Sequence, residues 1–227
     1  MKTNRNGQGS SLFSFCFFRL VCGSTRPFFA ALVVAVVLAS GCRTVPERPD
    51  DFVELTTVIP GLVLDIRYAT TNNFTGQKVY PDARCFLRRA TAEKLKRVQA
   101  DLAKQGLALK IFDGFRPLAV QRKFWEIMPD DRYVANPAKG SRHNRGAAVD
   151  LTLIRLSSGQ ELPMPTPFDD FSERAGRDYA NLPGELIRNR TLLREVMEKH
   201  GFVGLTTEWW HFDDADWKNY PIADMPK

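Results

Sequence analysis

Two short segments of the sequence carry residue types that can bind a metal ion. The first contains His143 and Asp150, and the second contains Glu208 and His211. Two imidazoles and one carboxylate are enough protein ligands for a catalytic zinc ion, which keeps its fourth position for water. The pattern therefore predicts a zinc centre formed by His143, Asp150 and His211, with Glu208 as a second carboxylate beside it.

Glu208 is the carboxylate that we expect to move protons in such a site. Zinc lowers the pKa of a bound water to about 7, and a neighbouring carboxylate can take a proton and pass it to a leaving amine. The spacing of Glu208 and His211 suits one face of a helix but gives opposite faces of a flat strand. We therefore expect a bend or bulge at residues 209–210, or Glu208 at the entrance of a strand over residues 206–212.

Arg116 is a third chemical group, in the turn-forming segment 113–117. Pro117 restricts its backbone, and a guanidinium fixed there can stabilise an oxyanion opposite the metal. Each feature alone has an ordinary explanation, because a turn arginine is usually solvated and a histidine near an acid is often structural. The chain has three histidines, and two of them fall in these segments, which favours a single site.

The elements that must position these residues form a mixed pattern of strands and helices. We expect helices from Thr91 to Gly106, from Leu118 to Ile127 and around residues 192–199. Strands are expected at residues 63–68, 107–112, 147–154 and 206–212. Because strands and helices do not alternate strictly, the pattern predicts an α+β fold.

The first 42 residues predict an export signal. They hold four basic residues and no acidic residue, followed by an apolar run over residues 28–39 and then Cys42. Cys42 after small residues resembles a bacterial lipobox, which implies cleavage before Cys42 and its lipidation. Ordinary cleavage near residues 39–41, with release of a soluble protein, is the alternative. We expect residues 43–51 to form a tether and residues 52–227 to form the functional domain.

Charge argues against a nucleic-acid-binding protein, and the cysteine content excludes an internal disulfide in the expected domain. The chain has 32 basic and 26 acidic residues, but four of the basic residues lie in the export signal, so the rest of the chain is nearly balanced. Charge therefore does not favour a nucleic-acid partner. Of the four cysteines, Cys85 alone lies in the expected domain, so an internal disulfide is impossible there. The fold must therefore rest on its hydrophobic core, to which a bound metal can add stability.

The combined motifs resemble a known family. Ser141-x-His143-x-x-Gly146-x-Ala148-x-Asp150 and Glu208-x-Trp210-His211 resemble the zinc D-Ala-D-Ala peptidases that share a core with Hedgehog signalling domains. Residues 67–76, 113–117 and 168–174 look like motifs of the D-alanyl-D-alanine dipeptidase branch known from vancomycin resistance. The resemblance covers residues 65–212 and implies a central antiparallel sheet with helices packed on it.

The resemblance also implies roles for single residues. It implies one zinc ion per chain on His143, Asp150 and His211, with Glu208 as catalytic base and Arg116 as stabiliser of the tetrahedral intermediate. Asp169 and Tyr68 would hold the ammonium group of the dipeptide, and Ser141 would lie near the substrate. Phe115 departs from the family pattern, in which tyrosine is frequent at this position.

The expected function is zinc-dependent hydrolysis of D-Ala-D-Ala to D-alanine at the cell envelope, in cell-wall turnover. The expected location is the periplasmic face of a bacterial membrane, the outer membrane, with the lipid anchor at Cys42. One alternative is a D,D-carboxypeptidase or endopeptidase acting on peptidoglycan stem peptides, against which Asp169 argues. A non-catalytic zinc-binding lipoprotein is the other alternative, and the intact Glu208 argues against it.

Overall fold

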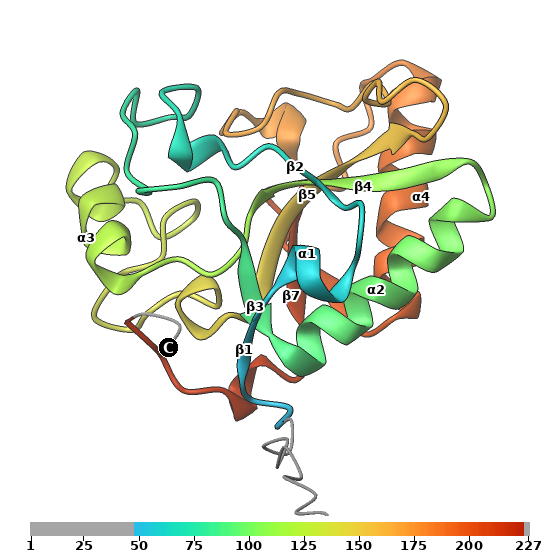
Figure 1. Ribbon diagram of the computed structural model, residues 1–227. Helices are drawn as coiled ribbons and strands as arrows, with labels where there is room; N and C mark the ends of the chain where they lie inside the picture. The colour runs from blue at the N-terminus through green and yellow to red at the C-terminus, as the bar shows by residue number, and fades with distance from the viewer. Residues whose placement is uncertain (1–47, 225–227) are drawn as a thin grey trace, which may run out of the picture. The chain divides into compact units, whose positions relative to one another are not determined.

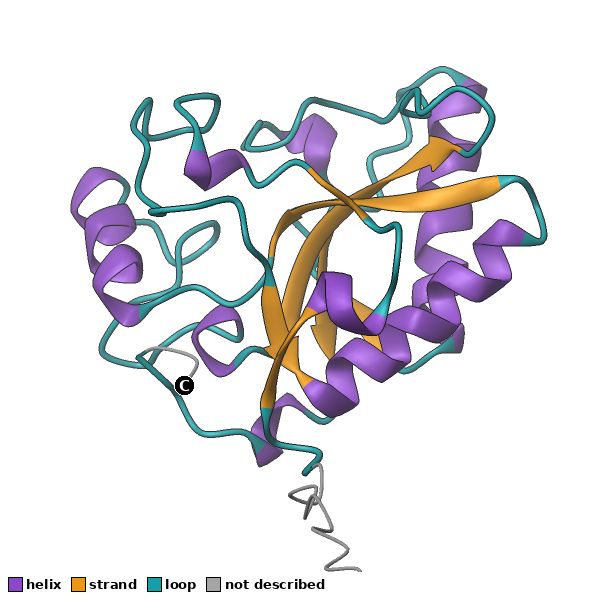
Figure 2. Cartoon of the chain, viewed as in Figure 1, coloured by secondary structure: helices purple, strands orange, loops and turns teal. Residues whose placement is uncertain are grey.

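The computed structural model describes residues 48–224 and shows a mixed set of strands and helices (Figures 1 and 2). The predicted export signal, Cys42 and the first part of the predicted tether lie outside these residues. The strands are β1 (Phe52–Glu54), β2 (Val63–Leu64), β3 (Phe86–Arg88), β4 (Leu107–Asp113), β5 (Ala148–Arg155), β6 (Phe202–Gly204) and β7 (His211–Asp214). The α-helices are α1 (Leu55–Val58), α2 (Arg89–Ala103), α3 (Leu118–Ile127) and α4 (Gly184–Lys199). The predicted α+β class is confirmed.

A five-stranded sheet with the order β2-β4-β5-β7-β6 forms the centre of the domain. The pairs β4–β5, β5–β7 and β6–β7 are antiparallel, as expected, whereas the edge strand β2 pairs with β4 in parallel. The parallel pair arises because the chain between β2 and β4 makes a crossover that includes α2, and parallel neighbours require such a connection. Strands β1 and β3 form a separate antiparallel pair.

Helices α2 and α4 lie on one side of this sheet, and α3 lies on the other side among long loops (Figure 1). Side chains alternate between the two faces of a strand. On β5, Val149, Leu151 and Leu153 join the hydrophobic core. Asp150 lies between them in the sequence and therefore points to the opposite face. The alternation of β5 thus separates the core from a polar face.

Helix α2 begins earlier than the sequence predicts. Thr91 is not its N-cap, because the helix starts at Arg89 and Arg88 occupies the cap position without a capping side chain. The Thr91 hydroxyl instead donates a hydrogen bond to Asp214 on β7, at 2.7 Å. Gly106 follows the helix with a φ of 71°, a left-handed conformation that glycine adopts without steric cost.

Two predicted strands are shorter than expected. The strand over residues 63–68 ends at Leu64, and a 3₁₀ turn, η1 (Arg67–Ala69), replaces its second half. The strand over residues 206–212 begins only at His211. The Arg177 guanidinium donates hydrogen bonds to the carbonyls of Leu205 and His211. These bonds close the intervening residues into a loop outside the sheet.

The predicted tether lies partly within the described residues. The carbonyls of Pro49 and Asp51 accept hydrogen bonds from the backbone of Ala90 and Arg89, so this part of the chain is attached to the start of α2. Between residues 48 and 224, no helix combines the length and apolar character that crossing a membrane requires.

Candidate active site

The three predicted zinc ligands meet on the polar face of the sheet. Asp150 on β5 lies opposite His211 on β7 and opposite Asp113 on β4. His143 lies in the 3₁₀ turn η2 (His143–Arg145), just before β5. Nε2 of His143 lies 3.1 Å from Nδ1 of His211 and 3.5 Å from Oδ1 of Asp150. Nδ1 of His211 lies 3.0 Å from the same Asp150 oxygen.

This triangle of atoms fits a zinc ion. Nitrogen and oxygen ligands about 2.0–2.1 Å from a tetrahedral zinc are separated from one another by about 3.3 Å. The three observed separations, 3.0, 3.1 and 3.5 Å, lie on both sides of this value. Two imidazole nitrogens and one carboxylate oxygen also form a donor set typical of catalytic zinc. The residues present can therefore hold this metal.

Hydrogen bonds behind the two histidines fix which ring nitrogen faces the metal position. Nδ1 of His143 donates to the Gly114 carbonyl at 2.7 Å, which leaves its Nε2 as an acceptor. Nε2 of His211 contacts Oδ1 of Asp213 at 2.9 Å, so its Nδ1 is the nitrogen that faces the metal position. Such outer partners hold the tautomer and the ring orientation of metal-binding histidines.

The charges of the cluster favour a cation. Burial alone would lower the pKa of His211, but the carboxylates of Asp213 and Asp150 offset this effect and raise the pKa to about 10. Burial alone would likewise raise the pKa of Asp150, yet His143 and His211 hold that pKa well below its ordinary value. The position between the three ligand atoms is therefore strongly attractive to positive charge.

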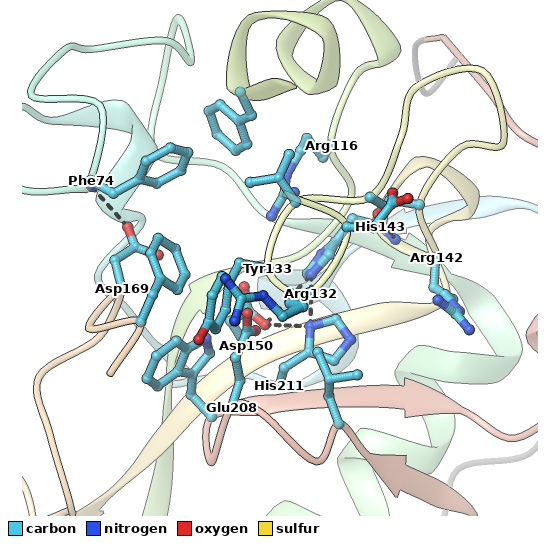
Figure 3. Close-up of a pocket in the computed structure, with 18 of the residues that line it drawn as sticks. Phe74, Arg116, Arg132, Tyr133, Arg142, His143, Asp150, Asp169, Glu208 and His211 are labelled. Atoms are coloured by element: carbon cyan, nitrogen blue, oxygen red, sulfur yellow. Dashed lines mark hydrogen bonds and ion pairs between the residues drawn. The ribbon is translucent and has the colours of Figure 1, made fainter. Parts of the chain in front are cut away.

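Glu208 lines the same cavity as the three ligand residues (Figure 3). It lies before β7 rather than within it, and the chain bends at residues 209–210. The structure therefore shows both features that the three-residue spacing between Glu208 and His211 led us to expect. Its side-chain oxygen Oε1 is buried and has no hydrogen-bond partner among the described residues. Burial raises the pKa of Glu208 to about 8. An unpartnered carboxylate with a pKa near neutrality is suited to accepting and releasing a proton.

Arg116 reaches the cavity from the turn after β4. Its Nε and Nη2 donate to Oδ2 of Asp113 at 3.2 and 2.8 Å, and its Nη1 donates to Gln121 at 3.0 Å. Burial alone would lower the pKa of Arg116, but the Asp113 carboxylate raises it well above its ordinary value. Arg116 is therefore a fixed positive charge in the cavity wall.

Asp169 and Tyr68 form one end of the cavity. The Tyr68 hydroxyl donates to Oδ1 of Asp169 at 3.0 Å, and the backbone N–H of Phe74 donates to Oδ2 at 3.1 Å. Asp169 has a φ of 63°, a left-handed conformation that is uncommon for a residue other than glycine. Burial raises the pKa of Asp169 to about 7.

Ser141 lines the cavity, and its hydroxyl forms a hydrogen bond within the turn that carries His143. The hydroxyl oxygen accepts a hydrogen bond from the backbone N–H of His143 at 3.0 Å. Ser141 therefore lines the cavity and also fixes the turn that carries His143. The structure thus gathers all eight predicted site residues of the domain around one cavity of about 90 Å³.

Sequence reasoning missed several residues of this site. Asp213 follows His211 by two positions on β7, and residues two apart on a strand share a face, so its partnership with His211 could have been found. Gln121 and Tyr80, which hold Arg116 and Asp113, are brought in by tertiary packing. The wall residues Arg132 and Tyr133 come from an irregular loop, which has no periodic signal.

The family model and the sequence relatives agree on one family. Residues 48–225 match the model of the peptidase M15 family, described as "D-ala-D-ala dipeptidase". The chain is 37% identical over 172 residues to a D-alanyl-D-alanine dipeptidase of Escherichia coli (strain K12), covering 76% of this chain and 89% of the relative. It is 34% identical over 197 residues to a D-alanyl-D-alanine dipeptidase of Enterococcus faecium, covering 77% and 97%. Among solved structures, the vancomycin-resistance D,D-dipeptidase VanXYg in complex with a D-Ala-D-Ala phosphinate analogue matches with a TM-score of 0.36 and 19% identity, covering 72% of this chain and 66% of that one.

Proposed function

This chain belongs to the D-Ala-D-Ala dipeptidase family, and from that premise we propose that it hydrolyses the dipeptide D-Ala-D-Ala to D-alanine with the help of zinc. One observation carries the proposal. The ligand atoms of His143, Asp150 and His211 converge in a cavity that also holds the unpartnered carboxylate of Glu208. A metal position beside a free carboxylate is the minimum apparatus for metal-assisted peptide hydrolysis.

His143, Asp150 and His211 would hold one zinc ion per chain. When bound, zinc would act as a Lewis acid that polarises the scissile carbonyl and acidifies a water molecule. The chain's own contribution is to present three ligand atoms whose orientation is already fixed. The Gly114 carbonyl and the Asp213 carboxylate provide this orientation through their bonds to the two histidines.

Glu208 would transfer the proton. Its unpartnered Oε1 would accept the proton of the attacking water and deliver it to the nitrogen of the departing D-alanine. The raised pKa, about 8, makes the protonated form a ready donor near neutral pH.

Arg116 would stabilise the negative charge that develops on the carbonyl oxygen. The Asp113 carboxylate and Gln121 fix the guanidinium before the substrate arrives. Little reorganisation is therefore needed as the charge appears, and a preorganised donor in a buried site contributes more than it would in water.

The Asp169 end of the cavity would bind the free ammonium group of the dipeptide. Asp169 is held by Tyr68 and Phe74, and an ammonium would supply the positive charge that this partly buried carboxylate lacks. A stem peptide would place a neutral amide there and leave the ionised carboxylate unpaired, which is costly in a buried site. The geometry therefore favours a dipeptidase over a carboxypeptidase acting on longer chains.

A direct assay tests this function. The purified protein is incubated with D-Ala-D-Ala, L-Ala-L-Ala and a pentapeptide ending in D-Ala-D-Ala, each with and without a chelator. We expect hydrolysis of D-Ala-D-Ala alone, its loss with chelator and its return with added zinc. Faster cleavage of the pentapeptide would instead support the carboxypeptidase alternative.

We also propose that the protein is exported and anchored by lipid at Cys42, on the periplasmic face of the outer membrane. The basic start, the apolar run and the small residues before Cys42 support this location. An enzyme placed there would act on D-Ala-D-Ala released during wall turnover rather than on the cytoplasmic pool. The mass of the mature N-terminal peptide tests the anchor, since an unmodified Cys42 contradicts it. Depletion of cytoplasmic D-Ala-D-Ala by the exported protein would contradict the role.

A further inference from the structure

A basic groove adjoins the proposed active site. We use this name for the cavity of about 400 Å³ whose lining includes Lys139, Arg142, Arg145 and Trp217. The guanidinium carbons of Arg142 and Arg145 lie 4.7 and 5.3 Å from the centre of the Trp217 ring. An aromatic ring that contacts two guanidinium groups holds both of them in place.

The basic groove shares part of its wall with the active-site cavity. Arg142, which lies between Ser141 and His143 in the sequence, lines both cavities, as do Asp131 and Ala135. Figure 3 shows Arg142 on the opposite side of the metal ligands from Asp169. If the Asp169 end takes the ammonium of the dipeptide, the second residue of the dipeptide points toward Arg142. This step rests on the proposed function.

The positive charge of the basic groove is only weakly neutralised by the protein. Nε of Arg142 lies 3.5 Å from Oδ2 of Asp213, and the Arg142 side chain is 42% exposed. Arg145 donates to a backbone carbonyl, that of Tyr220, rather than to a carboxylate. Lys139 is exposed. Among the described residues that line the groove, Asp131 supplies the one carboxylate, against three cations.

The size of the basic groove also exceeds what D-alanine needs. The active-site cavity measures about 90 Å³ and the groove beyond it about 400 Å³. A methyl side chain would leave this space and its charges unused. An acidic side chain on the second residue would reach toward the exposed ends of Lys139 and Arg142.

We propose that the basic groove binds an acidic side chain on the second residue of the dipeptide. Dipeptides such as D-Ala-D-Asp are then substrates, and they are preferred over neutral dipeptides of the same shape. Recognition depends on the side-chain carboxylate and not only on the α-carboxylate, which every dipeptide carries.

Matched substrates separate these two carboxylates. The purified zinc-loaded protein is assayed for kcat/KM with D-Ala-D-Ala, D-Ala-D-Asp and its neutral counterpart D-Ala-D-Asn. The variants are Lys139→Gln and Lys139→Glu, and the control is Arg97→Gln, which removes one positive charge from the exposed face of α2. The assays are run at low and high salt, because exposed charges are screened by salt.

We expect the wild type to favour D-Ala-D-Asp over D-Ala-D-Asn by about fivefold at low salt, as one or two partly exposed ion pairs allow. The preference should fall in Lys139→Gln, vanish or reverse in Lys139→Glu, and persist in Arg97→Gln. High salt should reduce it in the wild type.

Three results would overturn the inference. The first is equal hydrolysis of D-Ala-D-Asp and D-Ala-D-Asn by the wild type while D-Ala-D-Ala is cleaved. The second is an equal loss of kcat/KM for D-Ala-D-Asp and D-Ala-D-Asn in Lys139→Glu, which would mean that the groove binds only the α-carboxylate. The third is failure to hydrolyse any of the three, D-Ala-D-Ala included, which removes the proposed function and this inference together.

Discussion

His143 and His211 present different ring nitrogens to the same point, with Nε2 of His143 lying 3.1 Å from Nδ1 of His211. The difference follows from their outer partners. The Gly114 carbonyl binds Nδ1 of His143, and the Asp213 carboxylate binds Nε2 of His211. The metal site is therefore specified by residues behind the ligands as well as by the ligands themselves, and this can be tested.

Replacing Asp213 should weaken metal binding. In Asp213→Asn the partner of His211 Nε2 loses its charge, so we expect zinc affinity to fall by about 10–100-fold. Competition with a chromophoric chelator measures this affinity. The control is Asp216→Asn, because Asp216 pairs with Lys94 instead of a histidine. Equal zinc affinities for wild type and Asp213→Asn would show that Asp213 does not support the ligand.

Replacing Glu208 should remove catalysis and leave the metal in place. Glu208→Gln keeps the side-chain shape but cannot accept the proton, so we expect kcat to fall by about 10²–10⁴-fold. Metal analysis of the same preparation should give the zinc content of the wild type. Activity within a few fold of wild type would rule out Glu208 as the proton carrier.

Activity should rise with pH through the titration of Asp169. Its pKa is raised to about 7, so below that pH the carboxyl is neutral and cannot pair with the substrate ammonium. We expect kcat/KM for D-Ala-D-Ala to rise with pH in two steps. One step lies near 7 and comes from Asp169, and the other lies near 8 and comes from Glu208, which must be ionised to accept a proton. The step near 7 should disappear in Asp169→Asn, and a step near 7 that this variant retains would assign that titration to another group.

The titration of Asp169 should lower the stability of the protein as pH rises, whereas it raises the activity. The pKa of Asp169 in the folded protein lies above the ordinary value of 3.8. Its contribution to the free energy of unfolding is therefore fully present below about pH 4 and is lost as the pH rises through about 7. The free energy of unfolding of the wild type should therefore fall relative to Asp169→Asn across that window. Urea denaturation at pH 4.5 and pH 8 measures the difference, and a constant difference would contradict the assignment.

Replacing Asp113 should destabilise the fold strongly. Asp113 is fully buried and bonded to Arg116 and to the Tyr80 hydroxyl, so Asp113→Asn leaves a buried guanidinium without its counterion. We expect a loss of about 3–5 kcal/mol in the free energy of unfolding. Tyr80→Phe removes one neutral donor to the same carboxylate and should cost about 1–2 kcal/mol. Similar small losses for both variants in urea denaturation would argue against a buried charge pair.

Several elements were predictable because their signals are local. Helix α3 and strand β4 match the predicted ranges within one residue, since their apolar periodicity and flanking turns are encoded in consecutive residues. The residue types of the metal cluster were equally visible. The shortened strands were not predictable in this way, because β7 loses its first residues to bonds from Arg177, which is distant in the sequence.

The sequence by itself determined the donor types, the alternation that turns Asp150 away from the core, and the resemblance that unites the segments. Tertiary structure alone decided which nitrogen of each histidine faces the metal and which residues hold Arg116. It also placed the basic groove beside the site. The physical reason is that residue type and periodicity are properties of neighbouring residues, whereas register, burial and hydrogen-bond partners depend on strands and loops that meet only when the chain folds.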